Sequence, residues 1–186
     1  MVASGLVARS PYFTFKGNSM DIIRLEWYEV MQAGQLALMR TVESLRRGHK
    51  HKYGQTGQND LQNHFYGAMG EFAVAKCLDI YNCNTVNTFK AADLGGNLQV
   101  RATGCARNTK LIVRPDDRDD DYFILVDIQK ADGYYNATVG GWIRGEDAKQ
   151  ECFLSDAGYS DRPKAYFLGK EHLKTMIWLP HCDRGA

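Results

Sequence analysis

The chain has 186 residues and a formal net charge of +1, from 23 Lys and Arg residues against 22 Asp and Glu residues. This length is enough to bury a hydrophobic core, and 44% hydrophobic with 24% charged residues is the composition of a globular protein, not of a disordered, fibrous or membrane protein. The near-zero net charge excludes a protein that coats polyanions indiscriminately, so any contact with nucleic acid must depend on local patches.

Targeting signals and cysteine pairs are missing from the sequence. It contains no apolar run of roughly 18 residues or more and no apolar signal-peptide core, so we expect no membrane contact and a cytoplasmic, intracellular location. No two cysteines form a C-x-x-C pair, which favours reduced thiols over disulfides or zinc ligands. The cysteines are Cys77, Cys83, Cys105, Cys152 and Cys182.

The amino-terminal half predicts two helices. We expect residues 1–20 to be a flexible leader, native or added, and residues 21–186 to form a single domain. From Ile23 to Leu45 apolar residues recur at helical spacing, with Asp21 placed to cap the start, which predicts a long amphipathic N-terminal helix. After a polar loop at 48–59, a second helix is expected from near Asn59 or Asp60 to near Asp79.

Beyond Tyr81 the pattern changes to short apolar runs bounded by turn-forming residues, which is typical of strands. Five strands are expected, at 85–89, 98–103, 110–115, 122–128 and 134–143. The tail predicts a helical start at 145–149, a strand at 164–168 and a closing helical turn at 171–179. This order predicts an α/β or α+β fold in which a central mixed β-sheet is flanked by helices.

Glu71 is the first candidate for a functional carboxylate. Its helical neighbours at i±3 and i±4 are Gly67, Ala68, Val74 and Ala75, all small or apolar, which places Glu71 at the edge of the buried stripe. Glycines on this helix would let it approach a sheet closely. A buried carboxylate needs a partner. The alternative is an ordinary helix-face glutamate paired with Lys or Arg.

A predicted hairpin carries the other polar candidates. The segment LQVRAT alternates, so Gln99 and Arg101 share one face of the strand while Val100 lies on the other. Asp93 precedes this strand across a Gly-Gly-Asn turn, so it can meet the row of Gln99 and Arg101. The alternative is a half-exposed hairpin with a polar outer face.

A helix glutamate, then an aspartate, then Gln-Val-Arg on the next strand resembles the PD-(D/E)XK nuclease superfamily, over residues 59–103. The resemblance implies a restriction-endonuclease-like fold and hydrolysis of DNA phosphodiesters with Mg²⁺ or Mn²⁺. It assigns metal binding to Glu71, Asp93 and Gln99, with the Val100 carbonyl, and the role of the family's lysine to Arg101. Hard cations of this kind prefer such oxygen ligands.

Two departures from the family pattern leave other functions open. Gln99 offers a neutral amide where the family has a carboxylate, and Arg101 is never deprotonated, so it could stabilise a transition state but not act as a base. One alternative is a catalytically inactive member that binds nucleic acid or a protein. A second is a structural ion-pair cluster, in which Arg101 bonds Glu71 or Asp93 and leaves no room for a cation.

Two charged segments complete the sequence predictions. The junction of the two helices carries cations and an aromatic ring that could grip phosphates and stack on a base, or could be helix-end charges and a solvated loop. The run 116–121 predicts a solvated connection. We expect DNA as the partner, with a homodimer as a further option. The proposed DNA-contacting residues are Arg46, Arg47, Lys50, Lys52 and Tyr53.

Overall fold

The structure, a computed structural model, describes residues 21–48, 60–82, 84–86, 92–104, 109–157, 163–176 and 179. Two long helices and seven strands account for most of these residues. The helices are α1 (Trp27–Arg46), α2 (Asp60–Leu78) and the short α3 (Gly145–Ala148), with 3-10 turns at Glu151–Phe153 and Lys170–His172. The strands are β1 (Asp21–Leu25), β2 (Leu98–Thr103), β3 (Leu111–Val113), β4 (Tyr122–Ala131), β5 (Tyr134–Arg144), β6 (Leu154–Ser155) and β7 (Ala165–Leu168).

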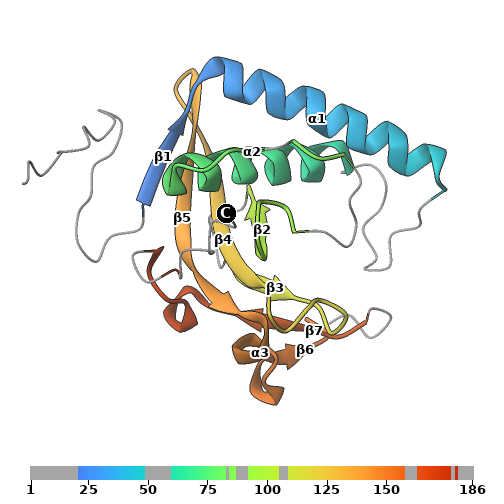
Figure 1. Cartoon of the computed structure of the whole chain (residues 1–186), viewed down its shortest axis with the longest axis vertical. Coiled ribbons are helices and arrows are strands. Elements are labelled where there is room, and N and C mark those ends of the chain that lie inside the picture. The colour runs from blue at the N-terminus through green and yellow to red at the C-terminus, as the bar shows by residue number, and fades with distance from the viewer. Residues whose placement is uncertain are drawn as a thin grey trace, which may run out of the picture.

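The central sheet has the strand order β1-β5-β4-β2. β2 runs parallel to β4, whereas β4, β5 and β1 pair antiparallel, so the sheet is mixed. A second, antiparallel sheet has the order β3-β7-β6. Figure 1 shows α2 lying across the strands of the central sheet, between α1 and β2, and the small sheet at the end of the view opposite α1. The predicted class, a mixed α+β fold with helices against a mixed sheet, is confirmed.

Alternation along β4 builds two cores, because successive strand residues point to opposite faces of a sheet. Ile124 and Val126 belong to the larger core, which α2 and α1 cover. Phe123 and Leu125 belong to a smaller core, shared with Leu111 of β3 and other residues. β4 is therefore buried on both faces, and β1 and β2 form the two edges of the sheet.

The predicted start of the first helix is wrong. Residues Asp21–Leu25 form β1, which pairs with β5, and α1 begins only at Trp27. The β-branched pair Ile22-Ile23 favours a strand, and β5 offers an edge for it to extend. Glu26 caps α1 in a capping box with Glu29, in place of the expected Asp21.

Most of the apolar stripe predicted along this helix is exposed. Trp27 and Leu45 are each 73% exposed, and Leu38 and Val42 are more than half exposed. The buried residues of α1 are Ala33, Leu36 and Ala37. Because two of these three are alanines, α1 packs closely against α2 through a narrow face of small side chains.

The remaining elements follow the sequence predictions in most places. The second helix and the strands predicted at 98–103, 110–115, 122–128, 134–143 and 164–168 are confirmed, as is the helical start at 145–149. Residues 84–86 are not a strand, and the rest of that predicted strand lies outside the described residues, as does the leader 1–20. Of the predicted closing helix, the start lies in the 3-10 turn Lys170–His172 and residues 173–175 are not helical, while residues 177–178 lie outside the described residues. None of the described helices is long and apolar enough to cross a membrane.

Candidate active site

Glu71 is buried beside the central sheet and held by an arginine of α1. Its neighbour Gly70 lies against β2: a Cβ there would come 2.6 Å from the Cβ of Ala102. Glu71 is 3% exposed and accepts two hydrogen bonds from Arg40, Nη1 to Oε1 at 2.6 Å and Nη2 to Oε2 at 2.8 Å. Arg40 also donates to the carbonyl oxygen of Thr85. The predicted buried carboxylate is confirmed, and its partner is Arg40.

Asp93 lies at the open edge of β2. The turn after it folds back so that the Leu94 amide donates to the Leu98 carbonyl at 3.2 Å. This brings Asp93 Oδ2 to 2.8 Å from the Val100 amide nitrogen, which donates a hydrogen bond to it. Because the N–H and C=O groups of one strand residue point to the same side, the Val100 carbonyl also faces this edge.

Gln99 and Arg101 point away from α2, as the alternation predicted. Gln99 Nε2 donates to Asp121 Oδ2 at 3.1 Å. Arg101 Nη2 donates to Asp117 Oδ2 at 3.0 Å and its Nε donates to the Ile112 carbonyl at 3.3 Å. Its guanidinium also lies over the Phe123 ring, 5.1 Å from the centroid. These contacts hold Arg101 in one orientation.

The structure places Arg101 near Asp93 and couples Asp93 electrostatically to Glu71, whereas Gln99 is turned toward Asp121. Arg101 Nη1 lies 3.9 Å from Asp93 Oδ2, and Asp93 interacts electrostatically with both Glu71 and Arg40. Two members of this cluster were missed from the sequence, Arg40 and Asp117. No local pattern marks Arg40, because its role depends on how α1 crosses α2. Asp117 stood in an acidic run that indicates only a solvated loop.

Burial raises the pKa of both carboxyl groups above their usual range. For Glu71 the loss of hydration outweighs the two hydrogen bonds from Arg40, and the negative charge of Asp93 raises the pKa further. For Asp93 burial again dominates, partly offset by the Val100 amide and by the charge of Arg101. Carboxylates held in an environment that disfavours their charge are common at functional sites, although structural ion pairs produce the same effect.

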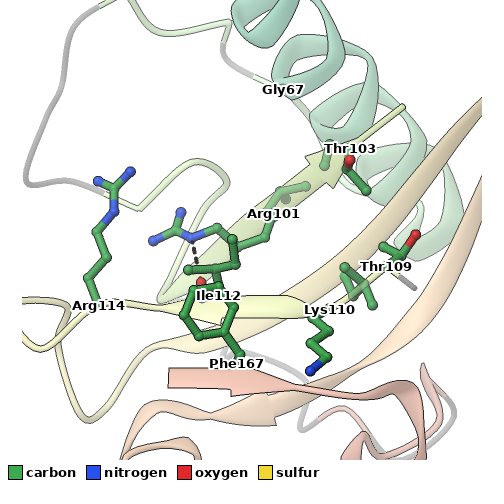
Figure 2. A pocket seen from close by; sticks show the side chains of 11 residues that line it. Gly67, Arg101, Thr103, Thr109, Lys110, Ile112, Arg114 and Phe167 are labelled. Carbon is green, nitrogen blue, oxygen red and sulfur yellow. Dashed lines mark hydrogen bonds between the residues drawn. The ribbon is translucent and has the colours of Figure 1, made fainter. Parts of the chain in front are cut away.

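A cationic pocket adjoins this cluster on the Arg101 face of β2. It has a volume of about 460 Å³ and lies between β2, β3, β7 and α2. Among its described lining residues three are cationic, and none is acidic. Figure 2 shows Arg101 and Arg114 at one end of the pocket and Thr103 with Thr109 at the other. The lining residues are Gly67, Val100, Arg101, Ala102, Thr103, Thr109, Lys110, Ile112, Arg114, Leu125 and Phe167.

The structure describes only two of the five residues predicted to contact DNA at the helix junction. Arg46 and Arg47 are exposed at the end of α1, and both donate to Glu43 at 2.6 Å. These contacts lower the pKa of Glu43 to about 2. Lys50, Lys52 and Tyr53 lie outside the described residues.

The acidic run between β3 and β4 is more structural than the sequence indicated. Asp121 is 4% exposed and accepts from Gln99, and Asp117 accepts from Arg101 and from the Arg114 amide. Asp119 is paired with Lys149 at 2.6 Å. The loop is therefore fastened to β2 and α3 by its own carboxylates, and only part of it is a solvated connection.

Few oxygen atoms of the predicted metal ligands are left without a partner. Both Glu71 oxygens accept from Arg40, and Gln99 is turned toward Asp121. Among the described residues, no partner is recorded for Asp93 Oδ1, the Val100 carbonyl or Gln99 Oε1, and the Gln99 amide is directed toward Asp121. Within the described part of the chain, no group of three or more His, Cys, Asp or Glu side chains is arranged to hold a metal ion.

Comparisons with known protein families, with curated proteins and with solved structures find no match to this chain. By its fold the protein belongs to the mixed α+β class.

Proposed function

We propose that this protein hydrolyses phosphodiester bonds of DNA with a divalent cation, at the cluster of Glu71, Asp93 and Arg101. The observation that carries the proposal is that Asp93, at the edge of β2, lies 3.9 Å from Arg101, which lines a cationic pocket. Glu71 is a second carboxylate of raised pKa, and it is electrostatically coupled to Asp93. A phosphate in that pocket would lie beside the carboxylates, which is the arrangement that metal-assisted hydrolysis requires.

The donor chemistry suits Mg²⁺ or Mn²⁺, because the groups at the edge of β2 are hard oxygen ligands. Asp93 Oδ1 and the Val100 carbonyl would hold the ion, and Glu71 would join them only by exchanging one of its bonds to Arg40. Such an ion supplies water activation and charge neutralisation when bound. Gln99 is assigned to the site by the resemblance alone.

Arg101 has the role of electrostatic stabiliser in this proposal. Its Nε and Nη2 are committed to Ile112 and Asp117, which fixes the guanidinium plane and leaves other N–H donors for a phosphate oxygen. Donors that are already oriented need no reorganisation when negative charge develops on the phosphate. An arginine stays protonated and cannot act as a general base, so Arg101 would only stabilise the negative charge that develops on the phosphate.

A second candidate function is binding of nucleic acid without cleavage. The specific observation in its favour is the bidentate bond of Arg40 to Glu71, which already neutralises a carboxylate that the metal would need. In this case the cationic pocket would bind phosphate, and Asp93 and Asp117 would only orient Arg101.

Nicking of supercoiled plasmid and cleavage of labelled oligonucleotides, in Mg²⁺, in Mn²⁺ and in EDTA, tests the proposal. We expect cleavage only with metal, and a loss of roughly a hundredfold or more in Asp93→Asn, because that variant removes a charged ligand. The matched control is Asp132→Asn, at an exposed position in the β4–β5 turn, which should cleave like the wild type.

Cleavage that persists in Asp93→Asn would remove this cluster as the active site. Salt-sensitive DNA binding with no cleavage in either metal would establish the second candidate instead. Absence of both DNA binding and cleavage would leave a structural ion-pair cluster as the explanation.

A further inference from the structure

The cationic pocket has two chemically different parts. Its cations are Arg101, Lys110 and Arg114, and its apolar surface includes Ile112 and Phe167. These last two are cross-strand partners in the β3–β7 pair, so their side chains lie next to each other. Figure 2 shows the Phe167 ring beside Ile112, with the Arg101 side chain directly above them.

This combination matches the chemistry of one nucleotide. Phosphate oxygens are bound by guanidinium and ammonium groups, and a base face is bound by aromatic and apolar side chains. Arg101 and Lys110 can serve the phosphate, while Phe167, which is only half-buried, and Ile112, which is 41% exposed, can serve the base. A pocket for inorganic phosphate alone would not need the apolar part.

The size of the pocket limits the form of nucleic acid that can use it. A volume of about 460 Å³ lies within the range of roughly 300–1,000 Å³ that is typical of small-ligand pockets. In a duplex the base faces are covered by their stacked neighbours, so Phe167 could not reach one unless the base left the stack. An unpaired strand exposes its bases without that cost.

We propose that this pocket binds one nucleotide of an unpaired strand, so that the substrate class is single-stranded DNA. The bound strand is a substrate only if the proposed nuclease function holds, so the inference rests on that function. The binding itself requires no metal and no cleavage.

Fluorescence anisotropy in EDTA tests the inference, with a labelled twelve-residue oligothymidylate and a labelled blunt duplex of equal length. We expect the single strand to bind at least about tenfold more tightly than the duplex. Phe167→Leu should weaken single-strand binding about fivefold or more, because it keeps an apolar side chain but removes the stacking ring. Lys110→Gln should weaken it severalfold by removing a phosphate contact.

Two exposed positions outside the pocket provide matched controls. Tyr81→Leu makes the same loss of an aromatic ring at a residue that is 85% exposed, and Lys130→Gln makes the same loss of charge on β4. Both should bind like the wild type. A circular dichroism melt of each variant separates loss of binding from loss of folding.

Equal affinity for the two DNA forms, or single-strand binding that is unchanged in Phe167→Leu, would overturn the inference. Tighter binding to a duplex with one mismatch than to the single strand would also overturn the inference. That result would indicate that the pocket binds a base flipped out of a duplex. The two proposals fail separately: single-strand preference without cleavage removes only the proposed nuclease, and metal-dependent cleavage that requires Asp93 but shows no strand preference removes only this inference.

Discussion

The buried carboxylate of Glu71 is neutralised by one partner, Arg40. Its carboxylate is 3% exposed, and the Arg40 side chain that bonds both of its oxygens is 13% exposed. Removing one member of a buried ion pair leaves an uncompensated charge, which costs far more than the pair contributes as a unit.

We therefore expect Arg40→Ala to lower the free energy of unfolding by about 3 kcal/mol at neutral pH. Urea denaturation followed by circular dichroism measures this change. Arg46→Ala, six residues further along the same helix and exposed, should leave the midpoint nearly unchanged. A midpoint for Arg40→Ala equal to that of Arg46→Ala would contradict the uncompensated-charge argument.

Asp93 should make stability fall as pH rises. Its pKa is raised in the folded state, so between the unfolded value near 3.8 and the raised value the native state binds more protons than the unfolded state. The stabilising contribution of the protonated form is complete below that window, and it is lost as pH rises through the folded pKa.

Asp93→Asn removes this titration and keeps an oxygen that can accept from Val100. Unfolding in urea at several pH values should show the variant and the wild type equally stable near pH 4, with the variant more stable by about 1 kcal/mol at neutral pH. The control Asp132→Asn should give no pH-dependent difference. A variant less stable than the wild type at neutral pH would show that the environment favours the charged carboxylate.

At the scale of elements, the contact of α2 with β2 positions the site, because Glu71 follows the glycine that touches the strand. A Cβ at Gly70 would come 2.6 Å from the Ala102 Cβ, closer than real Cβ contacts, and 3.1 Å from Val100 Cγ1, which is a tight contact. A Cβ at Gly67, one turn earlier, would have nothing within 4 Å. The same chemical change should thus have opposite effects at the two positions.

We expect Gly70→Ala to destabilise the protein by about 1–3 kcal/mol, since the helix must move off the strand. Gly67→Ala should stabilise it by about 0.5–1 kcal/mol, because alanine is the better helix former. Thermal denaturation of both variants measures the difference. Similar melting temperatures would mean that α2 can shift without cost, and that its contact with β2 does not fix Glu71.

Sequence patterns predicted helices and strands well where the apolar residues with helix or strand periodicity are also the residues that are buried. The apolar run of β4 and the small-residue face of α2 are examples, since both faces of β4 are covered and α2 meets the sheet through glycine and alanine. The first helix shows the limit. Its apolar residues have helical spacing, yet alanines make the contact with α2, and Ile22-Ile23 joins the sheet.

The same limit applies to the site. Glu71 and Asp93 could be predicted, because an acid among small residues and an acid before a tight turn are local signals. Arg40 and Asp117 could not be, because their partners lie 31 and 16 residues away in sequence. The approach of α1 to α2 and of the β3–β4 loop to β2 is decided by packing, which no local pattern records.

At the scale of the whole molecule, the net charge of +1 averages over unlike regions. The described lining of the pocket is cationic, and the edge of β2 carries the carboxylate of Asp93. Most acidic side chains of the β3–β4 loop form ion pairs or hydrogen bonds within the protein. A balanced total therefore conceals a short gradient of charge across β2, which would draw the phosphates of a bound strand toward the cationic pocket.

The hydrogen bond from Val100 to Asp93 also bears on aggregation of the protein at high concentration. β2 is one edge of the central sheet, and an edge strand with unpaired amides is a template on which a second molecule can add a strand. Asp93 occupies one of those amides with a negative charge and so blocks that growth. Solubility and the proposed chemistry would thus depend on the same carboxylate, and a screen that scored only loss of activity in Asp93→Ala would confuse aggregation with a missing ligand.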